Sequence, residues 1–317
     1  MRCFVTGGAG FIGSNLVDML LKEGHEVIAY DNLSTGFNKF FINAVNNDKF
    51  RFINGDLLDF NLLSHSLDGC DFVYHLAANA DIRFGTFHPK KDLEQNTIAT
   101  FNVLEVMRIN QIKQIAFASS SSIYGEAEIF PTPENAPCPL QTSLYGASKL
   151  AAESLIEAYC ESFNFQAWIF RFVSILGERY SHGHVFDFYK QLLVNPDELF
   201  ILGDGCQRKS YLYIQDCLLA VQIAIKNSHD KVNIFNLGTN EHCEVNHSIS
   251  WITEYLGLNP KLKYSGERKG WVGDIPFVFL DTTKICKIGW WPKLSIKEAV
   301  IKTLAFLEKN QWILERR

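Results

Sequence analysis

The first residues whose spacing points to chemistry are Gly8, Gly10 and Gly13, which form a G-x-G-x-x-G pattern near the start of the chain. An apolar stretch before them predicts a buried strand over 2–6, and the residues after them predict a helix over about 11–23. Between a strand and a helix, such glycines permit a tight turn and let the backbone approach a pyrophosphate, which the free N–H groups of the helix would bind. The pattern therefore indicates a dinucleotide site.

An acidic residue supports this interpretation. Asp31 follows a second predicted strand over 26–30. It lies near the offset of about 20 residues at which a carboxylate binds the hydroxyls of the adenosine ribose. Since a carboxylate in this place also repels a 2′-phosphate, the sequence favours NAD over NADP.

A second pattern can move protons. Tyr145 and Lys149 are four residues apart in a predicted helix over 144–163, so their side chains share one face. A free tyrosine titrates near pH 10, but a neighbouring ammonium and a positive nicotinamide both favour the phenolate. Tyr145 is therefore a candidate base that removes a hydroxyl proton while hydride leaves the same carbon. Upstream, a run of serines over 119–122 ends an apolar strand, where a hydroxyl could bond the same oxygen.

These residues need a sheet to position them. Strands alternate with helical patterns, notably 89–110 and 144–163, in the first half of the chain; the predicted strands are 2–6, 26–30, 50–54, 71–75, 114–118 and 166–170. Such alternation predicts an α/β fold of the Rossmann type, with a doubly wound parallel sheet. After Gly177 the elements become shorter, which predicts a smaller, mixed α/β substrate-binding cap. We expect an NAD-binding domain over 1–177, with chain returning around 215–240, and a cap made mainly of 178–317.

The composition excludes several classes of function. The chain has 317 residues, a net charge of −5 and no run of 18 apolar residues, so we expect no nucleic-acid partner and no membrane span. The chain enters its first strand at once, leaving no room for a signal peptide, and its eight cysteines lack C-x-x-C spacing, which favours a cytoplasmic location. His182 and His184 have no cysteine or carboxylate cluster beside them, so we expect no metal site.

With these motifs the chain resembles the extended short-chain dehydrogenase/reductase family, in its nucleotide-sugar epimerase/dehydratase branch, over nearly its whole length. The similar segments are Thr6–Gly13, Tyr30–Gly36, Gly55–Leu57, His75–Ala78, Gly203–Tyr211 and Arg268–Asp274. The resemblance implies a catalytic triad of Ser120, Tyr145 and Lys149. It implies NAD contacts from Gly7, Gly10, Phe11, Ile12, Asp31, Asn32, Ser34, Thr35, Gly36, Asp56, Leu57, Leu76, Ala77, Ala78, Asn96, Tyr145 and Lys149. It implies substrate contacts from Arg83, Ser121, Ser122, Ser174, Val185, Arg208, Lys209 and Arg268. Arg83 could instead pair with an acidic neighbour.

Departures from the family pattern bear on the substrate. Family members that eliminate water carry an Asp-Glu pair where this chain has Ser121 and Ser122, so the acid and base for elimination are missing. Hexose 4-epimerases of the family carry Phe-Asn where this chain has Val173 and Ser174. Lys209 replaces an arginine that grips the diphosphate, and a lysine cannot make that bidentate contact. The sugar pocket therefore differs from that of the ordinary 4-epimerases.

We accordingly expect NAD-dependent oxidation at C4 of a nucleoside-diphosphate sugar. One interpretation is a C4-dehydrogenase of an unusual sugar, such as a GDP-heptose for bacterial capsule or lipopolysaccharide synthesis. The alternative is a UDP-sugar 4-epimerase with a transient 4-keto intermediate. A third, from another class, is an NAD-binding regulatory protein without activity. The resemblance also implies a homodimer or tetramer through the helices at 89–110 and 144–163. Apolar positions such as Ile98, Phe101, Val103 and Leu104 give the first of these helices more apolar surface than one sheet face can cover.

Overall fold

The structure is a computed structural model that describes residues 1–79, 81–138 and 140–316. Its strands are β1 Arg2–Thr6, β2 Glu26–Asp31, β3 Phe50–Asn54, β4 Phe72–His75, β5 Gln114–Ser120, β6 Gln166–Phe172, β7 Ser174–Leu176, β8 Glu198–Ile201, β9 Arg208–Lys209, β10 Tyr211–Tyr213, β11 Val232–Leu237, β12 Cys243–Glu244, β13 Lys261–Tyr264 and β14 Phe277–Val278. Its α-helices are α1 Phe11–Lys22, α2 Phe60–Leu67, α3 Ile82–Phe87, α4 Pro89–Asp92, α5 Ala99–Ile109, α6 Leu144–Phe163, α7 His184–Val194, α8 Ile214–Asn227, α9 Val245–Leu256, α10 Thr283–Lys287 and α11 Ile296–Lys309. Short helices of other types are η1 Asn38–Phe41, η2 Leu93–Ile98, η3 Ser121–Tyr124 and η4 Gln311–Arg316.

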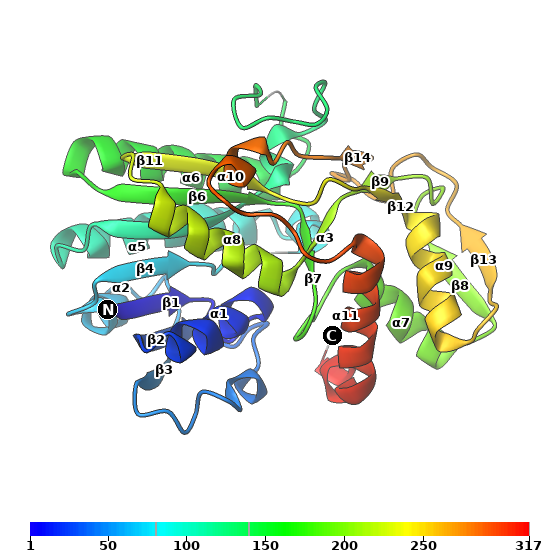
Figure 1. Cartoon of the computed structure of the whole chain (residues 1–317), viewed down its shortest axis with the longest axis horizontal. Coiled ribbons are helices and arrows are strands. Elements are labelled where there is room, and N and C mark those ends of the chain that lie inside the picture. Colours follow the sequence, from blue (N-terminus) through cyan, green and yellow to red (C-terminus); the bar gives the residue numbers. More distant parts are fainter. Residues whose placement is uncertain (80, 139, 317) are drawn as a thin grey trace. The chain divides into compact units, whose positions relative to one another are not determined.

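A seven-stranded sheet in the order β11-β6-β5-β4-β1-β2-β3 is the centre of the fold (Figure 1). β1 pairs in parallel with β2 and β4, β2 with β3, and β4 with β5. The strand order reverses direction at β1 and β4, and in open parallel sheets ligands bind outside the carboxyl ends of the strands at such a point. The predicted Rossmann-type fold is confirmed, and all six predicted strands are present.

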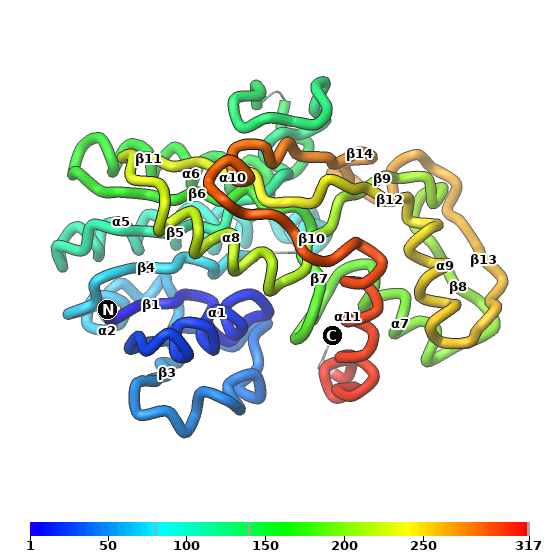
Figure 2. The backbone as a smooth tube through the Cα atoms, in the orientation of Figure 1, coloured from blue at the N-terminus to red at the C-terminus, as the bar shows by residue number. Residues whose placement is uncertain are grey.

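The chain divides into two compact units. The first comprises Met1–Ile123, Ser143–Arg171 and Ala224–Phe235, and the second Tyr124–Thr142, Phe172–Ile223 and Asn236–Arg317. The return of the chain to the sheet can be followed in Figure 2, where α8 leads into β11 beside β6. The second unit contains small sheets of two or three strands, among them β7 with β10 and β12-β9-β14.

Local sequence explains where the principal helices begin. The carboxylate of Asp59 accepts a hydrogen bond from the backbone N–H of Leu62 at the start of α2. The hydroxyl of Ser143 does the same for Gly146 at the start of α6, which bears the candidate base. Each side chain satisfies a donor that the first helical turn leaves unpaired, and a cap of this kind contributes about 1 kcal/mol.

A large apolar core covers one side of the sheet, between β1, β4, β5 and β6 and the helices α2, α5 and α6. Val103 and Leu104 of α5 are fully buried in this core, so of the four apolar positions only Ile98 and Phe101 can contribute to a subunit contact. Ile98 and Phe101 face outward, with exposed fractions of 40% and 43%. The helical period explains the difference, because positions 103 and 104 lie on the face that packs against the sheet.

Among the described residues, no helix is both long enough and apolar enough to cross a membrane. All eight cysteines fall in the part of the chain that the structure describes, and none of them forms a disulfide bond.

Candidate active site

The glycine loop after β1 has open space beside Gly10 and is closely packed beside Gly13. Gly7 has a φ of +66°, a conformation that glycine adopts readily. A Cβ at Gly13 would lie 2.1 Å from the carbonyl oxygen of Gly7, so that position is closed by packing inside the protein. A Cβ at Gly10 would meet only the carbonyl oxygen of Gly7, at 3.1 Å. Gly10 thus borders open space at the start of α1, as a backbone that approaches a pyrophosphate must.

Asp31 lies at the carboxyl end of β2 and faces the same loop. Its Oδ2 accepts a hydrogen bond from the N–H of Ala9 at 3.0 Å, and its Oδ1 accepts one from the N–H of Leu33 at 2.7 Å. Burial raises the pKa of this carboxyl, and the two backbone N–H groups oppose the shift. Because each carboxylate oxygen offers about two lone pairs, both oxygens keep an acceptor site for ribose hydroxyls.

The predicted adenosine contacts form a polar rim beyond Asp31. Asn32 donates from Nδ2 to the carboxylate of Asp56 at 3.0 Å, and its Oδ1 accepts from the N–H of Ser34 at 3.0 Å. Ser34 and Thr35 are exposed, whereas Leu57 is buried with 4% of its surface accessible. Any contact from Leu57 would therefore come from its backbone.

At the end of β4, a chain of hydrogen bonds fixes the neighbouring loop. The hydroxyl of Thr6 accepts from the N–H groups of Leu76 and Ala77, each at 3.1 Å, so its own proton goes to Nδ1 of His75 at 2.8 Å. Nε2 of His75 then donates to Thr100 at 2.9 Å. Burial, with Lys149 nearby, lowers the pKa of His75 to about 3, which keeps the imidazole neutral.

Asn96 lies in η2, a π-helical turn of the kind that often occurs at functional sites. Its Oδ1 accepts from the N–H of Asn79 at 2.8 Å, and its Nδ2 donates to Oγ of Ser148 at 2.8 Å. The Ser148 hydroxyl donates in turn to the carbonyl of Tyr145 at 2.8 Å. Asn96 thereby holds the first turn of α6.

Ser120 and Tyr145 meet at the carboxyl end of β5. The hydroxyl of Ser120 accepts a hydrogen bond from the N–H of Ser122 at 3.1 Å. The Ser120 side chain lies near enough to the Tyr145 phenol to favour the phenolate. We expected a lowered pKa for this phenol. Instead, burial raises the pKa of Tyr145 to about 12, against the opposing effect of Ser120. Burial prevails because it disfavours the phenolate.

Lys149 lies one turn further along α6 and is buried, with 2% of its surface accessible. Its Nζ donates to the carbonyl of Ala118 at 2.8 Å and lies 4.7 Å from the ring centre of Phe117. Burial lowers the pKa of Lys149 to about 7, and Glu153 opposes the shift. Ser120, Tyr145 and Lys149 thus converge at one strand end, on the side of the sheet where a ligand is expected.

Comparison with protein families agrees with this geometry. The model of the NAD dependent epimerase/dehydratase family matches residues 3–238. The chain belongs to this family. The matched span includes the glycine loop, Asp31 and the three catalytic candidates.

Full-length relatives of the epimerase/dehydratase family are similar to this chain. A putative UDP-glucose 4-epimerase of Methanocaldococcus jannaschii is 34% identical over 313 residues, covering 96% of this chain and 98% of that protein. A crystal structure of a UDP-galactose 4-epimerase superposes with a TM-score of 0.88 at 37% identity, covering 98% and 100% of the two chains. The UDP-glucuronic acid 4-epimerase of Bacillus cereus, solved with UDP-glucuronic acid and NAD, gives a TM-score of 0.89 at 26% identity over 98% and 99%.

The residues of the first unit fit NAD, the cofactor of this family. The open side of Gly10 can take the pyrophosphate, and the remaining acceptor sites of Asp31 can take the ribose hydroxyls. The N–H groups at the start of α1 would present a positive helix end to the phosphates. We propose the other predicted cofactor residues, Gly7, Phe11, Ile12, Gly36, Leu76, Ala77 and Ala78, as parts of the same cradle.

Three predicted substrate residues belong to the first unit. Ser121 and Ser122 begin η3, and Oγ of Ser122 accepts from Ser120 at 3.1 Å. Arg83 lies at the start of α3, with its Nε 3.9 Å from the carboxylate of Asp81. This pair supports the acidic-neighbour interpretation of Arg83. Both serines carry neutral hydroxyls, and neither supplies a strong acid or base.

The other predicted substrate residues lie in the second unit and differ in accessibility. Ser174, Arg208 and Arg268 are exposed, and the guanidinium of Arg208 lies 4.1 Å from the ring centre of Phe277. Lys209 is paired with Asp274 at 2.7 Å, and burial lowers its pKa. Its ammonium is therefore already engaged by a carboxylate. Val185 has 0% of its surface accessible, so we assign it to packing and no longer to substrate contact.

Two buried acidic residues beside the site were not predicted from the sequence. Asp92 accepts from Nδ2 of Asn79 at 2.8 Å beside Asn96, and Glu153 pairs with Arg171 at 2.8 Å. Each lies four residues from a recognised site residue, Asp92 before Asn96 and Glu153 after Lys149. That helical spacing was the only signal in the sequence.

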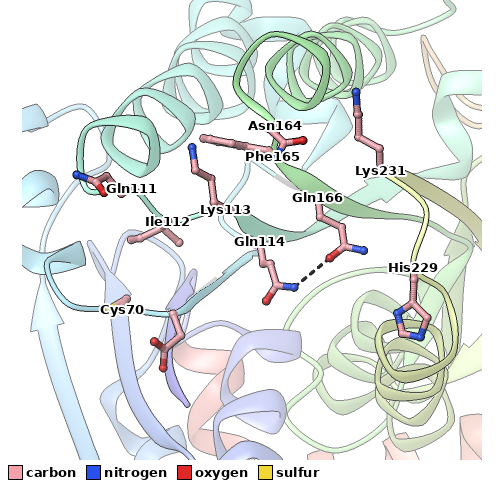
Figure 3. Close-up of a pocket in the computed structure, with 11 residues that line it drawn as sticks. Cys70, Gln111, Ile112, Lys113, Gln114, Asn164, Phe165, Gln166, His229 and Lys231 are labelled. Atoms are coloured by element: carbon pink, nitrogen blue, oxygen red, sulfur yellow. Dashed lines mark hydrogen bonds between the residues drawn. The ribbon is translucent and has the colours of Figure 1, made fainter.

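A hollow of about 630 Å³ lies elsewhere, at the amino ends of β4, β5 and β6 (Figure 3). In this view Gln114 and Gln166 form the hydrogen bond of 3.0 Å that joins two strand starts. Nζ of Lys113 donates to the carbonyl of Phe163 at 3.1 Å, and Lys231 pairs with Glu161 at 2.9 Å. Ligands of open parallel sheets bind at the carboxyl ends of the strands, whereas this hollow borders their amino ends, and both of its lysines already have partners. It is therefore not the candidate active site.

Proposed function

We propose that this protein is an NAD-dependent 4-epimerase of a UDP-sugar. The observation that carries the proposal is the convergence of Ser120, Tyr145 and Lys149 at the end of β5, next to a cradle that fits NAD. The relatives named above, which match nearly the whole chain, are described as UDP-glucose, UDP-galactose and UDP-glucuronic acid 4-epimerases.

In the proposed reaction Tyr145 removes the proton of the sugar 4-hydroxyl, and Ser120 hydrogen-bonds the same oxygen. Lys149 holds the nicotinamide ribose and stabilises the phenolate by its charge. When bound, NAD supplies the hydride acceptor at C4 and a positive charge that favours the phenolate. The 4-keto sugar then presents its other face, and Tyr145 returns the proton as the hydride is restored. The net reaction inverts C4 and consumes no oxidant.

A C4-dehydrogenase of a GDP-heptose receives no support from the named relatives. Such an enzyme would release its 4-keto sugar and require a second reaction to reoxidise NADH. The regulatory alternative is also weakened, because Tyr145 and Lys149 are both present, one turn apart on α6. A cytoplasmic location stays a prediction.

We expect a product whose mass equals that of its substrate. Purified protein, NAD and a panel of UDP-, GDP-, CDP- and dTDP-sugars would be incubated, and the products examined by mass spectrometry and proton NMR. Unchanged mass with a changed H4 coupling pattern for a UDP-sugar supports the proposal. Loss of two hydrogen atoms would identify a dehydrogenase. Loss of water would mean that an acid other than Ser121 or Ser122 performs an elimination.

We also propose a homodimer formed through α5 and α6, or a pair of such dimers. Ile98 at the end of η2 and Phe101 and Ile109 of α5 are exposed at 40–48%, and Leu144 and Phe163 of α6 are exposed at 45% and 40%. Solvent-exposed apolar residues gathered on two packed helices are typical of a subunit interface.

We expect light scattering at micromolar concentration to give the mass of two or four chains. Phe101→Glu should shift the mass toward the monomer, because it places a charge in the apolar contact. Ile42→Glu, at a site that is 74% exposed outside these helices, is the matched control and should leave the mass unchanged. A monomeric wild type would refute the interface.

A further inference from the structure

A buried ionic cluster lies behind the candidate catalytic residues, formed by Ser119, Lys149, Glu153 and Arg171 of the first unit. The exposed fractions are 2% for Lys149, 1% for Glu153 and 5% for Arg171. Lys149 and Glu153 are one helical turn apart on α6, so they face the same strands. Buried charges of this kind are costly unless they are paired and hydrogen-bonded.

Two strands hold the carboxylate of Glu153. Arg171 of β6 donates from Nη2 to Oε2 at 2.8 Å and from Nε to Oε1 at 3.2 Å. Ser119 of β5 donates from its hydroxyl to Oε1. The residue before Ser119 is Ala118, whose carbonyl accepts from Nζ of Lys149 at 2.8 Å, and the residue after it is Ser120. The Glu153 contacts thus join α6 to the strand end that bears the catalytic hydroxyl.

Few charges face Lys149 from the elements around it. His75 of β4 is neutral, and β5 presents the carbonyl of Ala118 and the ring of Phe117. Tyr145 on the same helix is an un-ionised phenol at neutral pH, since burial raises its pKa.

The remaining charges act from further away. Arg171 of β6 lies behind Glu153, as its contacts show. Asp92 acts on Tyr145. Burial raises the pKa of Glu157, one turn beyond Glu153, and the Glu153 carboxylate adds to this rise. Glu153 is the carboxylate that opposes the effect of burial on Lys149.

We propose that Glu153 is a positioning residue for the proposed reaction. Its negative charge keeps Lys149 protonated, and its hydrogen bonds tie the catalytic face of α6 to the end of β5. Its carboxylate is buried and bound by Arg171 and Ser119, so it would contact neither sugar nor cofactor. The inference rests on the proposed function for its catalytic meaning, but the charge state of Lys149 can be measured without sugar or NAD.

A role in folding alone predicts something different. Removal of one partner of a buried ion pair destabilises a protein because the other charge stays buried and unpaired. If Glu153 had a structural role alone, its replacement would lower thermal stability and leave the titration of Lys149 unchanged. The pH at which Lys149 loses its proton separates the two roles.

Three variants provide the test. Glu153→Gln removes the charge and keeps the shape of the side chain. Glu153→Gln combined with Arg171→Met removes both charges and so avoids an unpaired guanidinium. Ser119→Ala removes one hydrogen bond but keeps the charge, and it is the matched control. The titration of Lys149 would be followed by NMR of 13C-labelled lysine in NAD-free protein, with its signal assigned by its loss in Lys149→Met.

In Glu153→Gln we expect the titration midpoint of Lys149 to fall by about one to two pH units, as expected for loss of an opposite charge at an effective dielectric constant of about 20. In the double variant the fall should be smaller but still exceed about 0.3 units, because the lost Arg171 charge lies behind Glu153 and only partly offsets the loss of the carboxylate. Ser119→Ala should stay within about 0.3 units of the wild type, which we take as an unchanged titration. The sign follows from the charge: without Glu153, Lys149 is protonated only at lower pH. The epimerase rate of Glu153→Gln relative to the wild type should therefore be about tenfold lower at pH 7 and recover as the pH falls.

A midpoint within about 0.3 units of the wild type, in either folded variant that lacks Glu153, overturns the proposal. If Glu153→Gln alone does not fold, the double variant decides. A shifted midpoint in a protein that converts no sugar of the panel would leave Glu153 as the charge partner of Lys149 and refute the proposed function instead.

Discussion

Tyr145→Phe should lower kcat for the UDP-sugar by a factor of roughly a hundred to ten thousand, the usual range for a positioned acid–base group. The change removes the phenol oxygen, which Ser120 contacts, and leaves the ring that packs at the start of α6. NAD should bind with nearly wild-type affinity, because the glycine loop, Asp31 and Lys149 are untouched. The measurement is rapid-mixing absorbance at the nicotinamide band, together with calorimetric titration of NAD.

The matched control is Tyr159→Phe, on the same helix. The Tyr159 hydroxyl donates to Glu105 at 2.9 Å, away from the end of β5. Its removal should cost about 1 kcal/mol of stability, the net worth of one hydrogen bond, and leave kcat within a factor of two or so. If Tyr145→Phe transferred hydride at the wild-type rate, Tyr145 would not be the base.

The pH dependence of the wild type should reflect two opposed groups. The Tyr145 phenol must lose its proton to act as a base, and burial raises its pKa to about 12 in the NAD-free protein. Lys149 must keep its proton, although burial lowers its pKa to about 7. The positive charge of the bound cofactor favours the phenolate, and Glu153 favours the ammonium.

The sheet and the cofactor cradle could be predicted from the sequence because each signal is local. The glycine spacing, the buried apolar strands and Asp31 at a strand end all occur within segments of about thirty residues. The alternation of strand and helix then leaves few possible topologies, since parallel strands require crossover connections. Tyr145 and Lys149 were recognisable for the same reason, being one turn apart.

The parts that the sequence did not predict depend on contacts between distant segments. Lys209 and Asp274 are paired across 65 positions. Glu153 meets Ser119 and Arg171 only because α6 packs across β5 and β6. The raised pKa of Tyr145 likewise follows from burial, which no local pattern reveals. The division of the apolar positions of α5 between core and surface was not predicted either, because composition alone does not show which face of an apolar helix meets the sheet.

The second large effect should come from Gly10→Ala, which we expect to weaken NAD binding roughly tenfold to a hundredfold, the loss of one charge-assisted hydrogen bond to the pyrophosphate. Gly10 has a φ of −77° and a ψ of 179°, a conformation that alanine also adopts. Its new Cβ would meet only the Gly7 oxygen, at 3.1 Å, so the NAD-free protein should keep nearly its wild-type thermal stability. The methyl group would instead fill the space that the pyrophosphate needs.

Gly13→Ala is the matched comparison, and it should lower the stability of the protein even without NAD. Its Cβ would lie 2.1 Å from the oxygen and 2.8 Å from the carbonyl carbon of Gly7, so backbone must move even without NAD. Such overpacking costs about 1–3 kcal/mol, and the melting temperature of the NAD-free protein should fall with it. Calorimetric titration of NAD and thermal unfolding without NAD check both variants. Wild-type affinity in Gly10→Ala would show that the pyrophosphate does not lie against Gly10, and the cradle would then have to be placed elsewhere.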